Sequence, residues 1–172
     1  MKRFKISLIL VIFSSLQLAA QDVFQAARNN DVIALEALLT TAEVDVNQTD
    51  KRGFTPLILA VYNQGYEVAK LLLESGANPN AQDLSGNTAL MGASFKAYPE
   101  MVDLLLAHKA DVNLLNYNQA PALLFAATFG QIEIAKKLLE HGADKNLKDN
   151  SGKTALDHAQ IQENETMIKL LQ

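Results

Sequence analysis

The chain contains no cysteine, which excludes disulfide bridges, thiol chemistry and any metal site built from thiolates. Long apolar runs are also missing. The most apolar stretch, residues 6–18, has thirteen residues, whereas a membrane-spanning helix needs about 20. No glycine- or serine-rich linker, low-complexity run or block of like charges divides the chain after this stretch. We therefore expect that part to form one domain.

The N terminus has the layout of a secretory signal peptide. Residues 1–5 include three basic side chains, residues 6–18 are mostly apolar and uncharged, and the small residues Ala19 and Ala20 follow. This pattern predicts a signal peptide over residues 1–20, cleaved after Ala20 or alternatively after Ala19, and an exported protein that is periplasmic or secreted. An uncleaved anchor or a buried helix is the alternative interpretation. Because no cysteine follows, a lipid-anchored lipoprotein is excluded.

An excess of positive charge is also lacking. Without residues 1–20 the chain has 12 basic and 19 acidic residues, a net charge of −7. Nucleic acids are bound mainly through Lys and Arg contacts to phosphates, and anionic membrane surfaces attract basic segments. We therefore expect neither a nucleic-acid partner nor membrane contact after signal cleavage.

The chain does have an internal repeat, in which equivalent residues recur at a constant step of 33 along the sequence. Four series keep this step without drift: Asp50, Asp83, Asn116 and Asp149; Leu57, Leu90, Leu123 and Leu156; Ala60, Ala93, Ala126 and Ala159; Asn47, Asn80, Asn113 and Asn146. A fixed period of this length indicates a stacked array in which each unit contacts only its neighbours. Function in such an array lies on an extended surface, which argues against a catalytic pocket.

Each period encodes two short helices and a loop. In residues 50–82, Thr55 and Pro56 are suited to an N-cap and a first helical position. They predict a short helix ending near residues 64–65, and a second helix follows over about residues 67–74. Helices this short are unstable alone, so stacking must stabilise them. The side chains expected to face inward from the second helix are Val68, Ala69, Leu71 and Leu72.

The repeated openings read DKRGFTPLILA, DLSGNTALMGA, NYNQAPALLFA and DNSGKTALDHA, and the closings read SGANPN, HKADVN and HGADKN. This unit resembles an ankyrin repeat, with its D-x-x-G-x-T-P-L-H-x-A opening and its G-A-D/N-x-N closing. The resemblance covers essentially all of residues 21–172. It implies an all-α repeat solenoid of stacked helix-turn-helix units with projecting β-hairpin-like loops. We expect five units, the first and last being caps: 22–49, 50–82, 83–115, 116–148 and 149–172.

The sequence departs from the ankyrin pattern at several positions. In the fourth unit Gln119 replaces the turn glycine and Pro121 replaces the threonine, so the repeat pattern defines the geometry of this turn least. Ala97 replaces a glycine between the helices of the third unit. The histidine of the T-P-L-H motif is absent, which leaves these turns more dependent on apolar packing; its place is taken by Ile58, Met91, Leu124 and Asp157.

No motif indicates catalysis. His108 and His141 occupy the same place in adjacent units, but no cysteine or well-placed carboxylate completes a metal site, and we interpret both as surface residues near helix C-termini. Asp157 and His158 are adjacent in sequence, and neighbouring side chains on a helix do not face each other. The chain also lacks a G-x-S-x-G elbow, a phosphate loop and a dinucleotide fingerprint. We predict no enzyme activity, cofactor or metal.

The resemblance implies binding through a concave surface made of loop tips and the outward sides of the first helices. Five of the nine aromatic residues after residue 20 fall at such positions, and exposed aromatics are typical interface anchors. Half-burial of the helix aromatics against neighbouring repeats is the alternative. Several Lys and Arg residues share these positions, which favours an acidic protein partner. The predicted partner-binding residues are Arg52, Phe54, Tyr62, Asn63, Leu84, Asn87, Phe95, Lys96, Tyr117, Thr128 and Phe129.

We therefore expect a non-catalytic, monomeric protein–protein interaction module of the periplasm. By resemblance to small exported bacterial ankyrin-repeat proteins, it assists or inhibits another exported protein. An immunity protein or inhibitor that neutralises an exported toxin or enzyme is one alternative, and a protective partner of an enzyme such as a catalase is another. An enzyme or metal protein centred on the histidines, and a purely structural spacer, are the remaining hypotheses.

Overall fold

The computed structural model describes residues 22–41 and 44–172, so the predicted signal peptide, residues 1–20, lies outside the described residues. These residues form ten α-helices and no strand, which confirms the all-α solenoid. Consecutive projecting loops share one backbone hydrogen bond each, and side-chain hydrogen bonds also join them. None of the described helices is long and apolar enough to cross a membrane. The helices are α2 (Val23–Asn29), α3 (Val32–Thr41), α4 (Pro56–Tyr62), α5 (Tyr66–Glu74), α6 (Ala89–Lys96), α7 (Pro99–Ala107), α8 (Ala122–Thr128), α9 (Ile132–Glu140), α10 (Ala155–Ile161) and α11 (Glu165–Leu171).

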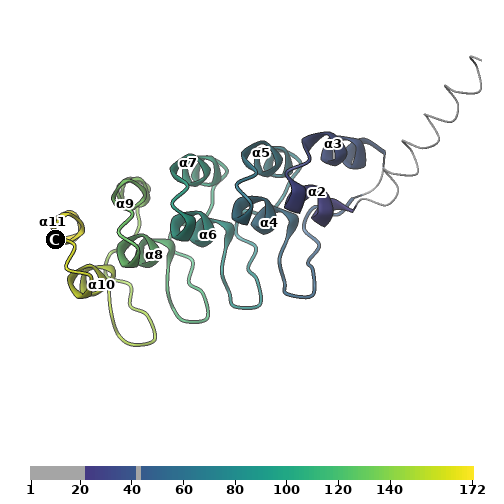
Figure 1. Ribbon diagram of the computed structural model, residues 1–172. Helices are drawn as coiled ribbons and strands as arrows, with labels where there is room; N and C mark the ends of the chain where they lie inside the picture. Colours follow the sequence, from purple (N-terminus) through teal and green to yellow (C-terminus); the bar gives the residue numbers. More distant parts are fainter. Residues whose placement is uncertain (1–21, 42–43) are drawn as a thin grey trace, which may run out of the picture.

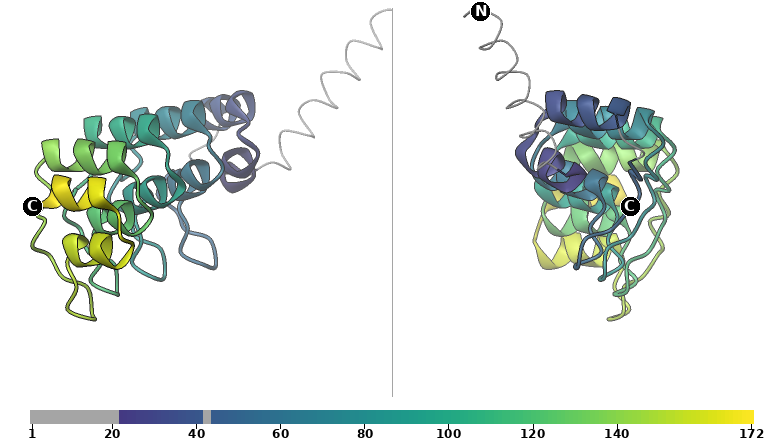
Figure 2. Two further views of the ribbon diagram at one scale, coloured as in Figure 1. Left: turned by 60° about the vertical axis from the view of Figure 1, so that its left-hand side comes forward. Right: turned by 90° about the vertical axis from the view of Figure 1, so that its right-hand side faces the viewer.

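The helices are arranged in two layers. The first helices of the pairs, α2, α4, α6, α8 and α10, form one row, and the second helices form a parallel row above it (Figure 1). Both views of Figure 2 show the loops extending from the row of first helices, away from the row of second helices. The loops and the first helices therefore share one side of the molecule.

Threonine caps start three of the first helices. The Thr55 hydroxyl accepts a hydrogen bond from the backbone N–H of Ile58 (3.2 Å), and Pro56 occupies the first helical position, as the sequence predicts. Thr88 and Thr154 cap α6 and α10 in the same way. Pro121 precedes α8 without a side-chain cap, yet the helix still forms. The cap is therefore helpful but dispensable where neighbouring repeats hold the helix.

The departures from the repeat pattern leave the backbone unchanged. Gln119, in place of the turn glycine, adopts a left-handed conformation with φ +59°, as the turn glycines of the other units do. Ala97, between α6 and α7, is likewise left-handed with φ +61°. Because non-glycine residues pay about 1–2 kcal/mol for this conformation, packing between repeats must impose it.

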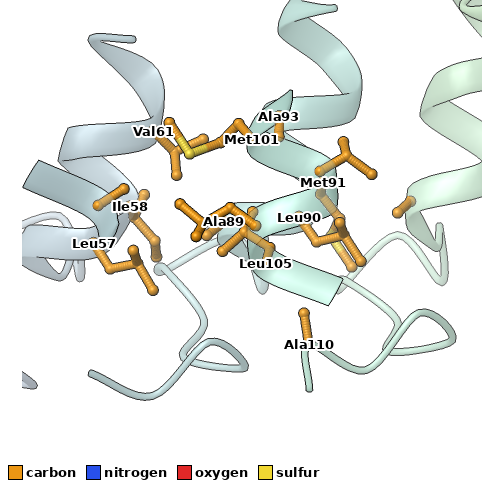
Figure 3. Close-up of a cluster of buried hydrophobic side chains, with 14 of the residues drawn as sticks. Leu57, Ile58, Val61, Ala89, Leu90, Met91, Ala93, Met101, Leu105 and Ala110 are labelled. Carbon is orange, nitrogen blue, oxygen red and sulfur yellow. The ribbon is translucent and has the colours of Figure 1, made fainter. Parts of the chain in front are cut away.

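The core lies between the two layers and continues from repeat to repeat. Ala60, Ala93, Ala126 and Ala159 are completely buried, which explains why the first helices approach closely with one small residue per period. Figure 3 shows Leu57, Ile58 and Val61 of α4 facing Ala89 of α6, with Met101 and Leu105 of α7 beside them. The expected burial of Leu71 is wrong in part. Leu72 and Leu73 are buried, whereas Leu71 is half-buried at the rim of a surface hollow near Ile33.

The asparagine series joins consecutive repeats. The Asn113 Oδ1 accepts a hydrogen bond from the Asp144 backbone N–H (2.8 Å), and its Nδ2 donates to the Gly142 carbonyl (3.0 Å). Asn47 forms the matching pair with Asn78 and Gly76. Both amides therefore satisfy two backbone groups of the following unit, which an isoleucine or alanine is unable to do.

Asn113→Ala is expected to lower the free energy of unfolding by about 1–2 kcal/mol, because two hydrogen bonds between repeats are lost. Asn146 is the matched control. It occupies the same position in the fourth unit, and within the described residues its side chain bonds only to Asp144 of its own loop (2.9 Å), so Asn146→Ala should cost less than about 0.5 kcal/mol. Urea unfolding measures both. Equal losses would contradict a bridging role for this series.

Candidate functional site

The candidate site is the concave face, which we define as the loops together with the exposed sides of α2, α4, α6, α8 and α10. It is hollowed in two places, each lined by both loop and helix residues. The first, which we call the N-terminal cleft, has a volume of ≈ 470 Å³, and the second, the C-terminal groove, has a volume of ≈ 400 Å³. Each is large enough to accept side chains of a partner.

The N-terminal cleft combines two guanidinium groups with aromatic rings. It is lined by Arg28, Arg52, Phe54, Leu59, Tyr62 and Asn63. Arg52 lies over the Phe54 ring, with 4.6 Å between its Cζ and the ring centroid, and the Phe54 and Tyr62 centroids are 5.9 Å apart. Arg28 donates to the Asp50 Oδ2 (3.0 Å). The cation–π contact with Phe54 favours one orientation of the Arg52 guanidinium, and the ion pair with Asp50 orients that of Arg28.

Two ionisable groups near this cleft have shifted pKa values. Burial raises the pKa of the Asp50 carboxyl, but hydrogen bonds from the backbone of Arg52 and Phe54, the Arg52 charge and the Arg28 hydrogen bond outweigh it, so the pKa lies below its usual value. Burial, and to a lesser degree the Asp83 charge, raises the pKa of the Tyr62 hydroxyl. Asp50 is thus a carboxylate and Tyr62 a neutral hydroxyl at neutral pH.

An aromatic pair occupies the middle of the concave face. The Phe95 and Phe129 rings meet edge to face, with 4.8 Å between their centroids, a favourable geometry for aromatic rings. Their exposed fractions are nonetheless 42% and 49%. Tyr62 is half-buried, whereas Phe95 and Phe129 are exposed. The alternative interpretation of the helix aromatics, half-burial against neighbouring repeats, therefore applies to Tyr62 and not to these two rings.

The other predicted residues differ in accessibility. Phe54, Asn87 and Thr128 are half-buried, and the Asn87 Oδ1 accepts a hydrogen bond from the Asn116 amide (2.8 Å). The predicted residues thus lie on the concave face, but some of their side chains are half-buried or hydrogen-bonded within it. The exposed members are Arg52, Asn63, Leu84, Phe95, Lys96, Tyr117 and Phe129.

Ile161 belongs to this face and was not among the predicted residues. Its exposed fraction is 58%, and it lies one repeat period after Thr128 and two periods after Phe95. The repeat period therefore contained the signal needed to find it. With Ile161 included, five of the seven large hydrophobic residues that are exposed in the described chain lie on the concave face; those five are Leu84, Phe95, Tyr117, Phe129 and Ile161.

The C-terminal groove is lined by apolar and amide side chains together with a His–Asp pair. Leu124, Phe125 and Phe129 are among its apolar residues, and Asn118 and Asn150 among its amides. The lining of this groove contains the Asp149 carboxylate and no Lys or Arg, whereas Arg28 and Arg52 line the N-terminal cleft. This difference in charge between the N-terminal cleft and the C-terminal groove could not be predicted from the sequence positions alone.

The His–Asp pair has a structural arrangement. The His158 Nε2 lies 2.8 Å from the Asp149 Oδ2, and the Ser151 hydroxyl donates to the Asp149 Oδ1 (2.7 Å). Burial raises the Asp149 pKa, but hydrogen bonds from Ser151, His158 and the loop backbone outweigh this and place it well below its usual value. Ser151 therefore bonds to the carboxylate and not to the imidazole, so it lacks the general base that activates a nucleophilic serine.

The other histidines occupy helix ends. His108 and His141 are the C-cap residues of α7 and α9, in line with the interpretation of both as helix-closing residues. The His141 Nδ1 lies 2.8 Å from the Lys137 carbonyl oxygen. In residues 22–41 and 44–172, no group of three or more His, Cys, Asp or Glu side chains is placed to hold a metal ion.

Known proteins resemble this chain in short segments. Over 61 residues it is 41% identical to palmitoyltransferase AKR1 of Gibberella zeae, a segment that covers 36% of this chain and 8% of that enzyme. Over 59 residues it is 39% identical to ankyrin repeat domain-containing protein 29 of Danio rerio, covering 34% of this chain and 20% of that protein. The chain thus spans less than a tenth of the palmitoyltransferase and a fifth of the second relative.

A family match covers far more of the chain. The family model described as ankyrin repeats (3 copies) matches residues 23–116 and again residues 90–172. These ranges include all five helix pairs and the loops between them. Stacked helix pairs, hydrogen-bonded loops and this match together show that the chain belongs to the ankyrin repeat family.

Proposed function

We propose that this chain is an exported, periplasmic protein that binds one partner protein through its concave face and performs no catalysis itself. The observation that carries the proposal is the concentration of exposed apolar side chains on that face. Exposed apolar patches in folded proteins tend to mark partner sites, and aromatic residues are frequent interface anchors. The residues proposed to contact the partner first are Phe95, Phe129, Tyr117 and Ile161.

The effect of binding on the partner follows from what the partner is. If it is a toxin or an enzyme exported to the same compartment, occupation of its active site makes this chain an inhibitor or immunity protein. If it is an unstable enzyme, the same contact protects it. A non-catalytic role agrees with the Ser151–Asp149–His158 geometry, in which the serine hydroxyl is bonded to the carboxylate.

Capture of a partner from periplasmic extract tests the proposal. The wild-type protein is expected to retain one protein that the Phe95→Ala/Phe129→Ala variant loses, because both rings are largely accessible and their removal deletes the apolar centre of the face. Tyr62 is left unchanged, since its half-buried ring packs near Phe54 and Gly92. The retained protein is identified by mass spectrometry, and the mature N terminus in the same extract is expected at Gln21.

Ile33→Ala is the matched control, because Ile33 is also an exposed apolar residue but lies on the second helix α3. It should capture the partner as the wild type does. Equal capture by the Phe95→Ala/Phe129→Ala variant would refute the concave face as the binding surface. A protein that stays in the cytoplasm with residues 1–20 attached would refute export.

A further inference from the structure

The two hollows of the concave face differ in chemistry: the N-terminal cleft contains two arginines, whereas the C-terminal groove is lined by apolar and amide side chains with a His–Asp pair. Resting on the proposed function, we infer that the partner binds as an extended segment that contacts both of these regions. A carboxylate of the segment binds in the N-terminal cleft, and a bulky apolar side chain binds between the Phe95–Phe129 pair and the C-terminal groove. The partner is thus a protein with an acidic residue and a large apolar residue at a defined separation.

The Arg52 side chain in the N-terminal cleft acts on the Asp50 carboxylate through its charge and not through a direct ion pair. Within the described residues, Arg52 forms no ion pair, while Arg28 is paired with Asp50. Asp50 accepts backbone N–H groups at its Oδ1 and Arg28 at its Oδ2, so its hydrogen-bonding capacity is largely occupied. The Arg52 guanidinium is held against the Phe54 ring, and it offers several N–H donors in a fork that matches a carboxylate. Prior ordering of this side chain reduces the entropic cost of binding.

No Lys or Arg is among the described residues that line the C-terminal groove. Its histidine is hydrogen-bonded to Asp149, and the remaining polar side chains of the lining are amides and hydroxyls. The Lys153 ammonium lies outside the lining and donates a hydrogen bond to the Ser151 hydroxyl oxygen (3.1 Å). Amides on Asn118 and Asn150 suit the N–H and C=O groups of an extended peptide backbone. The edges of Phe95 and Phe129, together with Leu124, suit an apolar side chain. An acidic side chain placed here would face the Asp149 carboxylate with no Lys or Arg in the lining, whereas two arginines line the N-terminal cleft beside Asp50. This difference favours the stated order of the two parts along the face.

The repeat spacing sets the separation of the two parts. Arg52 and Tyr62 belong to the second repeat and the groove begins in the fourth, two helix spacings away. Packed helices are about 8–10 Å apart, and an extended chain rises about 3.3 Å per residue. The carboxylate and the apolar side chain should therefore be separated by about five or six residues of the partner segment.

Selection from a phage library of random dodecapeptides against the purified protein tests this inference. Enriched peptides should contain Asp or Glu together with Phe, Leu, Ile or Trp at about that separation. Peptides selected against Arg52→Gln should lose the preference for an acidic residue and keep that for an apolar one. Peptides selected against Phe95→Ala/Phe129→Ala should lose the preference for an apolar residue and keep that for an acidic one. For the best synthetic peptide, Arg52→Gln should raise the dissociation constant about tenfold.

Lys70→Gln, which removes a positive charge from the exposed side of α5, is the matched control and should leave the selected sequences unchanged. An acidic preference that survives in Arg52→Gln, or enriched peptides without acidic residues, would overturn the inference. So would the absence of any enriched peptide. If capture of a partner from extract still succeeds in that case, the protein recognises a folded surface and the proposed function stands. If capture fails as well, both fall.

Discussion

Leu105→Ala is expected to lower the free energy of unfolding by about 2–5 kcal/mol, the range found when a buried leucine is cut back to alanine. Leu105 is completely buried on α7, and Figure 3 shows it within the cluster that α4, α6 and α7 form. Because Leu105 lies in the central repeat, the cavity left by its truncation weakens packing against the units on both sides. Urea unfolding followed by circular dichroism measures the loss.

Leu71→Ala is the matched control for this prediction. The chemical change is the same and the residue also lies on a second helix, but Leu71 is half-buried at the rim of a surface hollow. Its removal should cost about 1–2 kcal/mol, since part of the side chain is already in water. Leu72, one repeat period before Leu105 and also completely buried, should respond to alanine as Leu105 does. A loss at Leu71 as large as that at Leu105, or wild-type stability of Leu105→Ala, would contradict the observed packing.

The parts of the fold that repeat locally could be predicted from the sequence. Thr55 and Pro56 indicate a helix start without reference to distant residues, and the buried alanines recur at one fixed position in each unit. The inward face of the second helices is harder to predict, because the local sequence does not show that Leu71 is partly buried while the adjacent Leu72 and Leu73 are buried. Their burial depends on the rotation of α5 against α3 and α4, which the local sequence does not determine.

Contacts between unlike positions of neighbouring repeats could not be predicted from the period. The Phe95–Phe129 ring contact and the Arg28–Asp50 ion pair both join different positions of adjacent units, whereas the period compares equivalent positions. The His158–Asp149 bond joins a helix to the loop before it. The charge division of the candidate site depends on the Arg28–Asp50 and His158–Asp149 pairs, so it became visible only in the structure.

Gly86→Ala is expected to cost about 2–4 kcal/mol, because two unfavourable terms act together. Gly86 has φ +78°, a conformation that costs a non-glycine residue about 1–2 kcal/mol. An added Cβ would also lie 2.7 Å from the backbone nitrogen of Tyr117 and 2.7 Å from its Cδ1. The clash would strain the hydrogen bond from the Tyr117 N–H to the Ser85 carbonyl (3.1 Å), which joins consecutive loops.

Gly152→Ala separates the two terms. Gly152 occupies the same loop position in the last repeat with the same φ, +78°, but no atom lies within 4 Å of an added Cβ. Its substitution should therefore cost only the conformational part, about 1–2 kcal/mol. Gln119, at the equivalent position of the fourth repeat, already tolerates φ +59°, and the next loop there has Asn150 in the place of Tyr117. If urea unfolding gave equal losses for Gly86→Ala and Gly152→Ala, the Tyr117 contact would contribute nothing to stability. A larger loss for Gly86→Ala would show that this glycine is what allows the Tyr117 ring to lie at the tip of the concave face.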